Sequence, residues 1–171
     1  INIGTASATD PEGQTVTFSL SGTGSENFSV DSSGNISLVN ALDYETATSY
    51  TLALNASDGV NTTSSELIIT VDDVNEAPSL SNSLAASSFA ENVATGTTIA
   101  SASASDPESQ TITYSLSGTG SGNFAVDSAG NITLAAGLDY ETATSYSLTL
   151  SASDGVNTTN NSLTITIDDV D

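Results

Sequence analysis

The chain repeats itself over most of its length, and this repeat constrains the fold more than any other feature. Residues 1–75 align with residues 97–171 without a gap, and 51 of the 75 paired positions are identical. A repeat of 96 residues is too long for a helical or leucine-rich solenoid unit and suits one whole small domain. The sequence therefore predicts two tandem copies of one module, residues 1–77 and residues 78–171.

Within each module, apolar residues occur at every second position. Three such stripes of the first copy recur in the second: Val16, Phe18 and Leu20; Tyr50, Leu52, Leu54 and Ala56; Leu67, Ile69 and Val71. This alternation is typical of antiparallel strands with one buried face, and turn sequences separate the stripes at the spacing of a β-sandwich. We expect seven strands in the complete copy: 84–91, 97–104, 110–117, 123–127, 131–134, 145–152 and 162–168.

The two copies differ at their beginnings. The second contains residues 79–96, for which the first has no counterpart ahead of Ile1. We therefore expect the first sandwich to lack its first strand and to carry an open edge of unpaired N–H and C=O groups. Two explanations stay open: the 171 residues are a window from a longer array, which we favour, or a preceding or neighbouring chain donates the strand. A first module that closes its sheet with its own residues would refute both.

Charge excludes several classes of function. The chain has 21 carboxylates, no lysine, arginine or histidine, and a net charge of −21. Binding to nucleic acid or to an anionic membrane would bring two polyanions together, so we exclude both. Without histidine, lysine or cysteine, most acid–base chemistry lacks its usual groups, and disulfides and structural zinc sites are excluded. The sequence also contains no run of about 18 apolar residues, so we expect no insertion into a bilayer.

The carboxylates recur in pairs. The segment "LDYETATSY" occurs at residues 42–50 and again at residues 138–146, each time with an aspartate two positions before a glutamate. In an extended chain, side chains two positions apart point to the same face. Because the chain has no basic side chain, a cation must come from solution or the charges must stay apart in water. Ligand sets made only of oxygen favour calcium, with magnesium second.

Five motifs together resemble the cadherin repeat family. The motifs occur in the order of that family and together span essentially the whole chain. Within the modules, "ASDPE" at 104–108 resembles D-x-D, "DYE" at 43–45 resembles L-D-R-E, and "ASDG" at 56–59 and 152–155 resembles A-x-D. Between the modules, "DVNEAP" at 73–78 resembles the linker D-x-N-D-N-x-P, and "AENVATGT" at 90–97 resembles x-E-N. These spellings are most similar to cadherin-like repeats of giant bacterial surface proteins. Glu108 replaces an aspartate of the family pattern, Tyr44 replaces an arginine, and the linker is one residue shorter.

The resemblance implies the fold and the ligands. The expected fold is all-β, with two tandem seven-strand Greek-key cadherin-like (immunoglobulin-like) sandwiches, the first lacking its first strand. Calcium is implied between modules, with up to three ions at the central junction. The ligands implied for that junction are Asp43, Glu45, Asp73, the backbone oxygen of Asn75, Glu76, Asp106, Glu108 and Asp154. Those implied for the outer junctions are Asp10, Glu12, Asp58, Glu91, Asp139, Glu141 and Asp169.

Other interpretations compete with calcium. The acidic pairs also fit solvated loop ends of a halophilic or marine surface protein, although charge alone does not explain their fixed positions in five ordered motifs. Tyr44 and Tyr140 lie between two carboxylates and are interpreted as rim residues, with sugar stacking as the alternative. Paired Asp and Glu also hydrolyse glycosides. Every pair recurs in both copies, however, and no aromatic-lined cleft is evident, so we expect no enzyme.

Two functional hypotheses follow. The first is a structural spacer: a calcium-rigidified repeat of an extracellular or cell-surface stalk, adhesin or filament, whose partners are neighbouring repeats. The linker favours rigidity, because it contains Pro78, lacks glycine and is too short for a flexible tether. The second is a calcium-dependent binding module for surface polysaccharide or for homophilic cell–cell adhesion. The near-identity of the copies and the absence of tryptophan favour the spacer.

Overall fold

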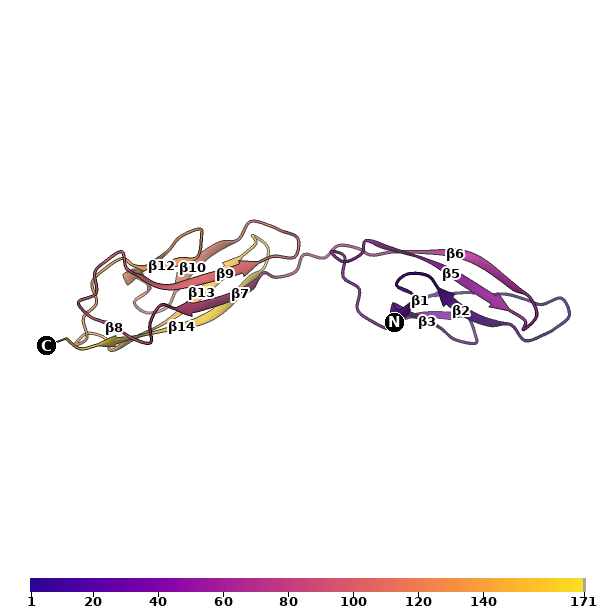
Figure 1. Ribbon diagram of the computed structural model, residues 1–171, viewed down its shortest axis with the longest axis horizontal. Coiled ribbons are helices and arrows are strands. Elements are labelled where there is room, and N and C mark those ends of the chain that lie inside the picture. Colours follow the sequence, from indigo (N-terminus) through magenta and orange to yellow (C-terminus); the bar gives the residue numbers. More distant parts are fainter. Residues whose placement is uncertain (171) are drawn as a thin grey trace. The chain divides into compact units, whose positions relative to one another are not determined.

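The computed structural model describes residues 1–170, and their alternating sequence forms strands. Strand accounts for 48% of the chain and helix for 4%, which confirms the all-β prediction. The chain divides into two units, Ile1–Val74 and Asn75–Asp171, each with its own pair of sheets (Figure 1). Among residues 1–170, helix is limited to single 3₁₀ turns, η1 (Ser25–Asn27) and η2 (Ser121–Asn123).

The first unit consists of two three-stranded sheets. One sheet has the order β1-β4-β3, and the other has the order β2-β5-β6. All neighbours within these sheets are antiparallel. Their bounds are β1 (Asn2–Thr5), β2 (Thr17–Ser21), β3 (Phe28–Val30), β4 (Asn35–Leu38), β5 (Ser49–Ser57) and β6 (Thr62–Thr70).

The second unit repeats this plan and adds one strand to each sheet. Its sheets have the orders β11-β12-β9-β7 and β10-β13-β14-β8. The bounds are β7 (Ser79–Leu84), β8 (Phe89–Ala90), β9 (Thr98–Ser105), β10 (Thr113–Ser117), β11 (Phe124–Val126), β12 (Asn131–Leu134), β13 (Ser145–Ser153) and β14 (Thr158–Asp168). The added strands are β7, antiparallel to β9, and β8, parallel to β14 (Figure 1).

The added strands correct one prediction. A single first strand at residues 84–91 was expected, whereas Leu84 ends β7 and Phe89 begins β8. The chain joins one sheet, crosses through four residues and joins the other sheet. The sequence pattern did not predict β7, because the alternating positions of this strand hold two leucines separated by an asparagine and therefore form no apolar stripe. The prediction that the first unit lacks these strands is confirmed for the residues that the structure describes.

The predicted stripes form the core of the second unit. The inward-facing side chains of β13 and β14 are buried: Tyr146, Leu148, Leu150, Ala152, Leu163, Ile165 and Ile167. Ile99 of β9 and Ile132 of β12 close the core from the opposite sheet, both with no exposed surface. The ring of Tyr146 packs edge-on against Phe124, with centroids 5.3 Å apart, which confirms its predicted role in packing. One continuous core thus fixes the two ends of this unit, where the loops carry the acidic motifs.

Candidate metal centre

A group of three carboxylates lies at one end of the second unit. Glu91 follows β8, and Asp139 and Glu141 belong to the loop between β12 and β13. One oxygen of each carboxylate lies within 4.8 Å of an oxygen of each of the other two. Sequence reasoning assigned all three to one set, and the structure brings them together although Glu91 lies almost 50 positions before the other two.

Glu91 is held by backbone groups from two other segments. Its Oε2 accepts a hydrogen bond of 2.9 Å from Tyr140 N, and its Oε1 accepts one of 3.2 Å from Val170 N. Its own N–H donates to the carbonyl of Asp168, at the end of β14. A partly buried glutamate thus joins the start of the module to the acidic loop and to the end of the last strand. Asp169, which was predicted to belong to the same set, directly follows β14.

Asp139 is oriented by a local turn. Thr142 donates to it twice, from its N–H at 3.1 Å and from its hydroxyl at 2.8 Å. These two bonds, the hydroxyl bond first, lower the pKa of Asp139 below its usual value. Asp139 is therefore charged at neutral pH. Because no lysine, arginine or histidine exists anywhere in the chain, no side-chain cation balances this group.

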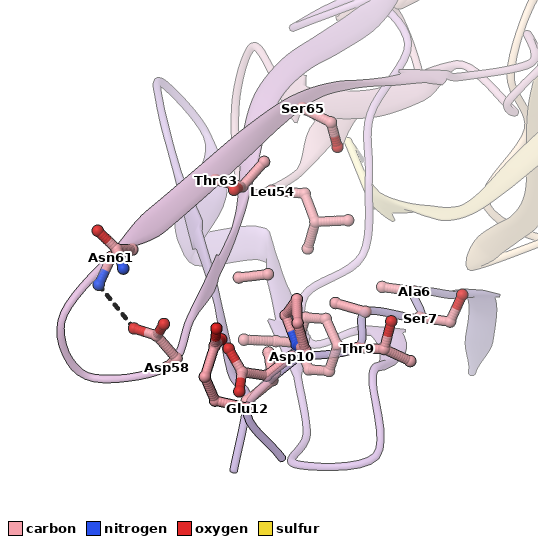
Figure 2. Close-up of a pocket in the computed structure, with 15 residues that line it drawn as sticks. Ala6, Ser7, Thr9, Asp10, Glu12, Leu54, Asp58, Asn61, Thr63 and Ser65 are labelled. Carbon is pink, nitrogen blue, oxygen red and sulfur yellow. Dashed lines mark hydrogen bonds between the residues drawn. The ribbon is translucent and has the colours of Figure 1, made fainter. Parts of the chain in front are cut away.

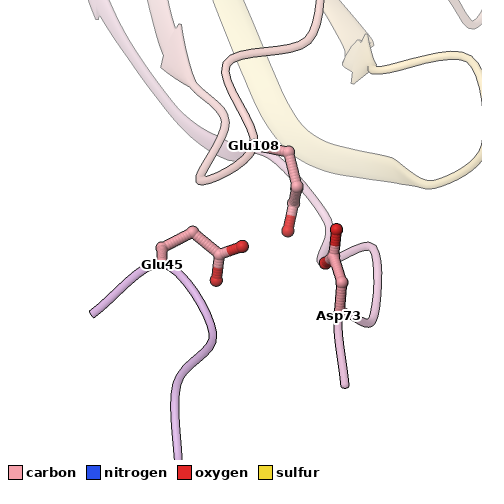
Figure 3. Close-up of side chains that lie close together, drawn as sticks. All are labelled: Glu45, Asp73 and Glu108. Carbon is pink, nitrogen blue, oxygen red and sulfur yellow. The ribbon is translucent and has the colours of Figure 1, made fainter. Parts of the chain in front are cut away.

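The first unit builds the same acidic loop. The N–H of Thr46 donates to Asp43 Oδ1 at 3.1 Å, and this bond is the largest cause that lowers the pKa of Asp43. Glu45 and Asp73 have carboxylate oxygens within 4.8 Å of each other (Figure 3). Glu45 comes from the loop and Asp73 follows the last strand of the unit, so two of the three predicted carboxylates at this end converge.

The opposite end of the second unit is built around residues 75 and 76. The side-chain amide of Asn75 donates to Asp154 Oδ2 at 2.8 Å. The backbone carbonyl of Asn75 accepts a hydrogen bond of 2.9 Å from the side-chain amide of Asn157. The N–H of Glu76 donates to Glu108 Oε1 at 3.4 Å. The predicted residues Asn75, Glu76, Glu108 and Asp154 therefore form one connected group within this unit.

Asp154 is held as a charged acceptor. Partial desolvation alone would raise the pKa of Asp154, but the Asn75 amide and the N–H groups of Val156 and Asn157 outweigh it and lower the pKa. Both N–H groups donate to Oδ1 at 2.6 Å. The same turn recurs at Asp58 in the first unit, whose pKa is lowered chiefly by the N–H of Asn61.

Two carboxylate oxygens at this end are buried without a hydrogen bond. They are Asp106 Oδ2 and Glu108 Oε2, while Asp106 Oδ1 accepts a 2.9 Å bond from the N–H of Gln110. A buried anionic oxygen without a donor is costly, because desolvation of its charge is not compensated. A cation would compensate it. The positions of these two oxygens are therefore suited to the coordination of a hard metal ion.

Glu76 also affects the charge of Glu108. A side-chain hydrogen bond with Glu76 is the largest cause that lowers the pKa of Glu108 below its usual value.

The corresponding end of the first unit carries Asp10, Glu12 and Asp58. They gather at one end of a hollow that is drawn in Figure 2. Asp10 Oδ1 accepts a hydrogen bond of 2.8 Å from the N–H of Gln14, and Asp58 closes the turn to Asn61. These three predicted residues share one end, but their group does not include residues equivalent to Asn75 and Glu76.

Sequence reasoning missed two amides. The side-chain amide of Asn157 donates a hydrogen bond to the backbone carbonyl of Asn75, and the side-chain amide of Gln110 donates one to the side-chain oxygen of Asn75. Both residues recur in the first copy, as Asn61 and Gln14. That recurrence is the signal in the sequence that points to them.

The structure is that of tandem, mainly antiparallel β-sandwiches whose ends carry groups of acidic side chains. The chain belongs to the cadherin domain family, whose family model matches residues 2–72 and 86–168. This confirms the family resemblance of the motifs. Among the described residues, we find no helix of sufficient length and hydrophobicity to cross a membrane.

Relatives and solved structures are similar over most of the chain. Cadherin-related family member 1 of Mus musculus is 35% identical over 88% of this chain and 19% of its own length. Protocadherin Fat 4 of Homo sapiens is 32% identical over 79% of this chain and 3% of its own length. The chain thus spans less than a fifth of these curated relatives. The structure of human protocadherin-24 EC1-2 (form II) superposes with a TM-score of 0.65 at 25% identity, covering 99% of this chain and 90% of that one.

Proposed function

We propose that the chain is a calcium-binding structural segment of an extracellular adhesion or surface protein. The observation that carries the proposal is the convergence of Glu91, Asp139 and Glu141 within 4.8 Å in a chain without a basic side chain. Carboxylate and carbonyl oxygens are the ligands that calcium prefers. The relatives are cadherins by name, and a similar solved structure is that of the protocadherin gamma B2 extracellular cadherin domains 3-6.

The proposed ligands follow the motifs. One set joins the end of the first unit to the start of the second: Asp43, Glu45, Asp73, Asn75, Glu76, Asp106, Glu108 and Asp154. The outer sets are Asp10, Glu12 and Asp58 at one end and Glu91, Asp139, Glu141 and Asp169 at the other. The buried, unbonded oxygens of Asp106 and Glu108 support the first set, and the oxygen triad supports the last.

Bound calcium would supply positive charge, and the protein would supply carboxylate ligands that are already oriented. Backbone and hydroxyl donors hold Asp139, Asp154 and Glu91 in fixed positions before any ion arrives. Extracellular calcium modules bind with dissociation constants of about 10⁻⁴ to 10⁻³ M, so such ions would be bound outside cells. Calcium that is shared by residues before and after residue 74 would stiffen the connection. Small-angle scattering with and without calcium tests this rigidity.

The experiment compares charge-matched variants. Asp139→Asn with Glu141→Gln removes two carboxylates from the triad, and Glu26→Gln with Glu66→Gln removes two exposed carboxylates that belong to no motif. Calcium should raise the melting temperature of the unchanged chain and of the Glu26/Glu66 variant, and should raise it less in the Asp139/Glu141 variant. Equal calcium responses in both variants would rule out the triad as a binding site.

Homophilic adhesion is the second candidate function. It is favoured by the similarity, at a TM-score of 0.59 and 25% identity, to a structure titled as a protocadherin gammaB7 EC3-6 cis-dimer. Sedimentation of the chain at rising concentration in calcium tests it: self-association that EGTA abolishes supports adhesion, and a calcium-loaded monomer supports the spacer. Polysaccharide binding finds no support in the matched names and stays testable on a glycan array.

Two finer predictions remain part of the proposal. The residue sequences of the motifs favour a large bacterial surface protein, whereas the matched relatives named above are from mouse and human. A domain boundary at residues 77 and 78 is also proposed. Expression of residues 78–171 alone tests this boundary, and a cooperative thermal transition with native-like circular dichroism is the expected result.

A further inference from the structure

The second unit begins with a short segment that precedes its first strand. Residues 75–78 end directly before β7, and the side chain of Pro78 is fully buried although it lies outside any strand. The hydroxyl of Thr159 donates a hydrogen bond to the carbonyl of Pro78. The buried ring and this bond fix one end of the segment, and Asn75 forms its other end.

Asn75 is bonded to the body of the unit through its side chain and its backbone carbonyl. Its side-chain amide donates to Asp154 Oδ2 at 2.8 Å, and its Oδ1 accepts a hydrogen bond from the side-chain amide of Gln110. The side-chain amide of Asn157 donates to its backbone carbonyl at 2.9 Å. A carboxylate only accepts, so Asn75 presents its NH₂ group to Asp154 and its oxygen to Gln110. The partners of Asn75 therefore determine its orientation.

The donors in this group are neutral. The chain has no lysine, arginine or histidine, so its side-chain donors to oxygen are amides and hydroxyls. It has two glutamines, Gln110 and Gln14, which occupy the same position in the two copies. Because every bond of Asn75 described above joins two protein groups, these bonds require no ion.

The turn that carries Gln110 is strained. Ser109 has a φ of +60° and is, in the described part of the chain, the one residue other than glycine with a positive φ. Its counterpart in the first copy is Gly13. A serine persists in this left-handed region where the surrounding structure fixes it. The N–H groups of Ser109 and Gln110 both donate to Asp106, at 3.1 Å to its carbonyl and at 2.9 Å to its Oδ1. These bonds hold the backbone of Gln110 in a fixed position.

The amides compensate only part of this acidic end. Asp154 accepts hydrogen bonds at both carboxylate oxygens, one of them from Asn75. Asp106 Oδ2 and Glu108 Oε2 are instead buried without a hydrogen bond. The amides and a cation would therefore act on different oxygens of the same end.

We propose that Gln110 and Asn157 form an amide clip that holds residues 75–78 on the second unit in the absence of calcium. The clip consists of these two side-chain amides and the bond between Asn75 and Asp154. Gln110 and Asn157 are then positioning residues for the metal centre, because calcium binding does not have to order the segment first. This positioning role rests on the proposed calcium function, whereas closure of the clip does not.

NMR relaxation of the whole chain in EGTA tests the clip. Order parameters of residues 75–77 should be about 0.85, as in a rigid backbone, and should fall below about 0.6 in the Gln110→Ala/Asn157→Ala variant. The control variant, Gln14→Ala/Asn61→Ala, changes the same residue types at the matching positions of the first unit and should leave residues 75–77 rigid. Values below about 0.6 in the unchanged chain would overturn the proposal, and so would a rigid segment in the Gln110/Asn157 variant.

A milder variant guards against unfolding of the second unit. Gln110→Met keeps a long unbranched side chain but removes the amide, and the amides of β13 report in the same spectra whether the unit is folded. Loosening that is confined to residues 75–77 while β13 stays protected would support the clip. A folded variant in which residues 75–77 are as rigid as in the unchanged chain would overturn the role of Gln110.

Calcium titration separates the clip from the metal centre. The Gln110→Ala/Asn157→Ala variant should bind calcium roughly 10-fold more weakly at this end, as reported by the Glu76 amide. The Tyr140 amide reports the triad at the other end, where affinity should stay unchanged. Equal affinity at the Glu76 end in both proteins would overturn the positioning role. If no protein binds calcium, the proposed function fails, and the order parameters in EGTA still decide whether the clip closes.

Discussion

Truncation of one leucine in each copy compares a closed core with an open one. Leu150 in β13 has no exposed surface, and it lies between Leu116 of β10 and Asn161 of β14. Removing its outer carbons with Leu150→Ala leaves a cavity that well-packed neighbours cannot fill. Such truncations cost about 2.5–5 kcal/mol, and the full burial of Leu150 places it in the upper half of this range.

The matched change in the first unit is Leu54→Ala. Leu54 occupies the same position in β5 but lines the hollow and is partly exposed. Truncation there enlarges a space that already opens to water, so we expect a cost of about 1–2.5 kcal/mol, roughly half of the buried case.

Native-state hydrogen exchange measures both costs in one sample. Amides of β5 report the free energy of opening of the first unit, and amides of β13 report that of the second. Because a unit of this size is stable by only about 5–15 kcal/mol, Leu150→Val provides a milder variant if Leu150→Ala unfolds. Equal costs at Leu54 and Leu150 would contradict this expectation, since they would mean that both cores are equally closed in solution.

Two further predictions concern turns in the second unit. Gly130→Ala should destabilise the unit by about 1–3 kcal/mol in thermal melts, because φ is +82° and the new Cβ would lie 2.4 Å from the carbonyl oxygen of Ala102, whereas Gly137→Ala meets no neighbour and should be nearly neutral. Hydrogen bonds from Asn131, the side-chain amide first, lower the pKa of Asp127 below 3.8. Its contribution to stability should therefore be complete above pH 3.8 and be lost as pH falls through the lowered pKa, and NMR titration of Asn131→Ala should return that pKa toward 3.8.

Strands with a periodic apolar face were predictable from the sequence. Residues 131–134 were placed correctly, and the strands at 145–153 and 98–105 were located to within one residue at each end. Their inward positions are held by leucine, isoleucine and tyrosine, so the two-residue period is strong. β7 was missed because its position depends on hydrogen bonds from Thr159 and Asn161, about 80 residues away, rather than on its own pattern.

The candidate metal residues were predictable as types but not as groups. A repeated D-x-E motif indicated oxygen ligands, because the copies keep Asp43 and Glu45 as Asp139 and Glu141. The convergence of Glu91 on that loop depends on the parallel pairing of β8 with β14, a tertiary feature that local sequence does not encode. The amide of Asn157 likewise acts on a residue 82 positions away.

Calorimetric titration of calcium chloride into the chain after EGTA treatment measures calcium binding directly. We expect saturable binding with a dissociation constant of about 10⁻⁴ to 10⁻³ M, and fewer sites in the Asp139→Asn/Glu141→Gln variant. At a hundredfold excess over that constant, each site should stabilise the folded state by about 2.7 kcal/mol. No heat of binding and no change in melting temperature at about 10 mM calcium, roughly ten times the upper constant, would contradict calcium binding by this chain.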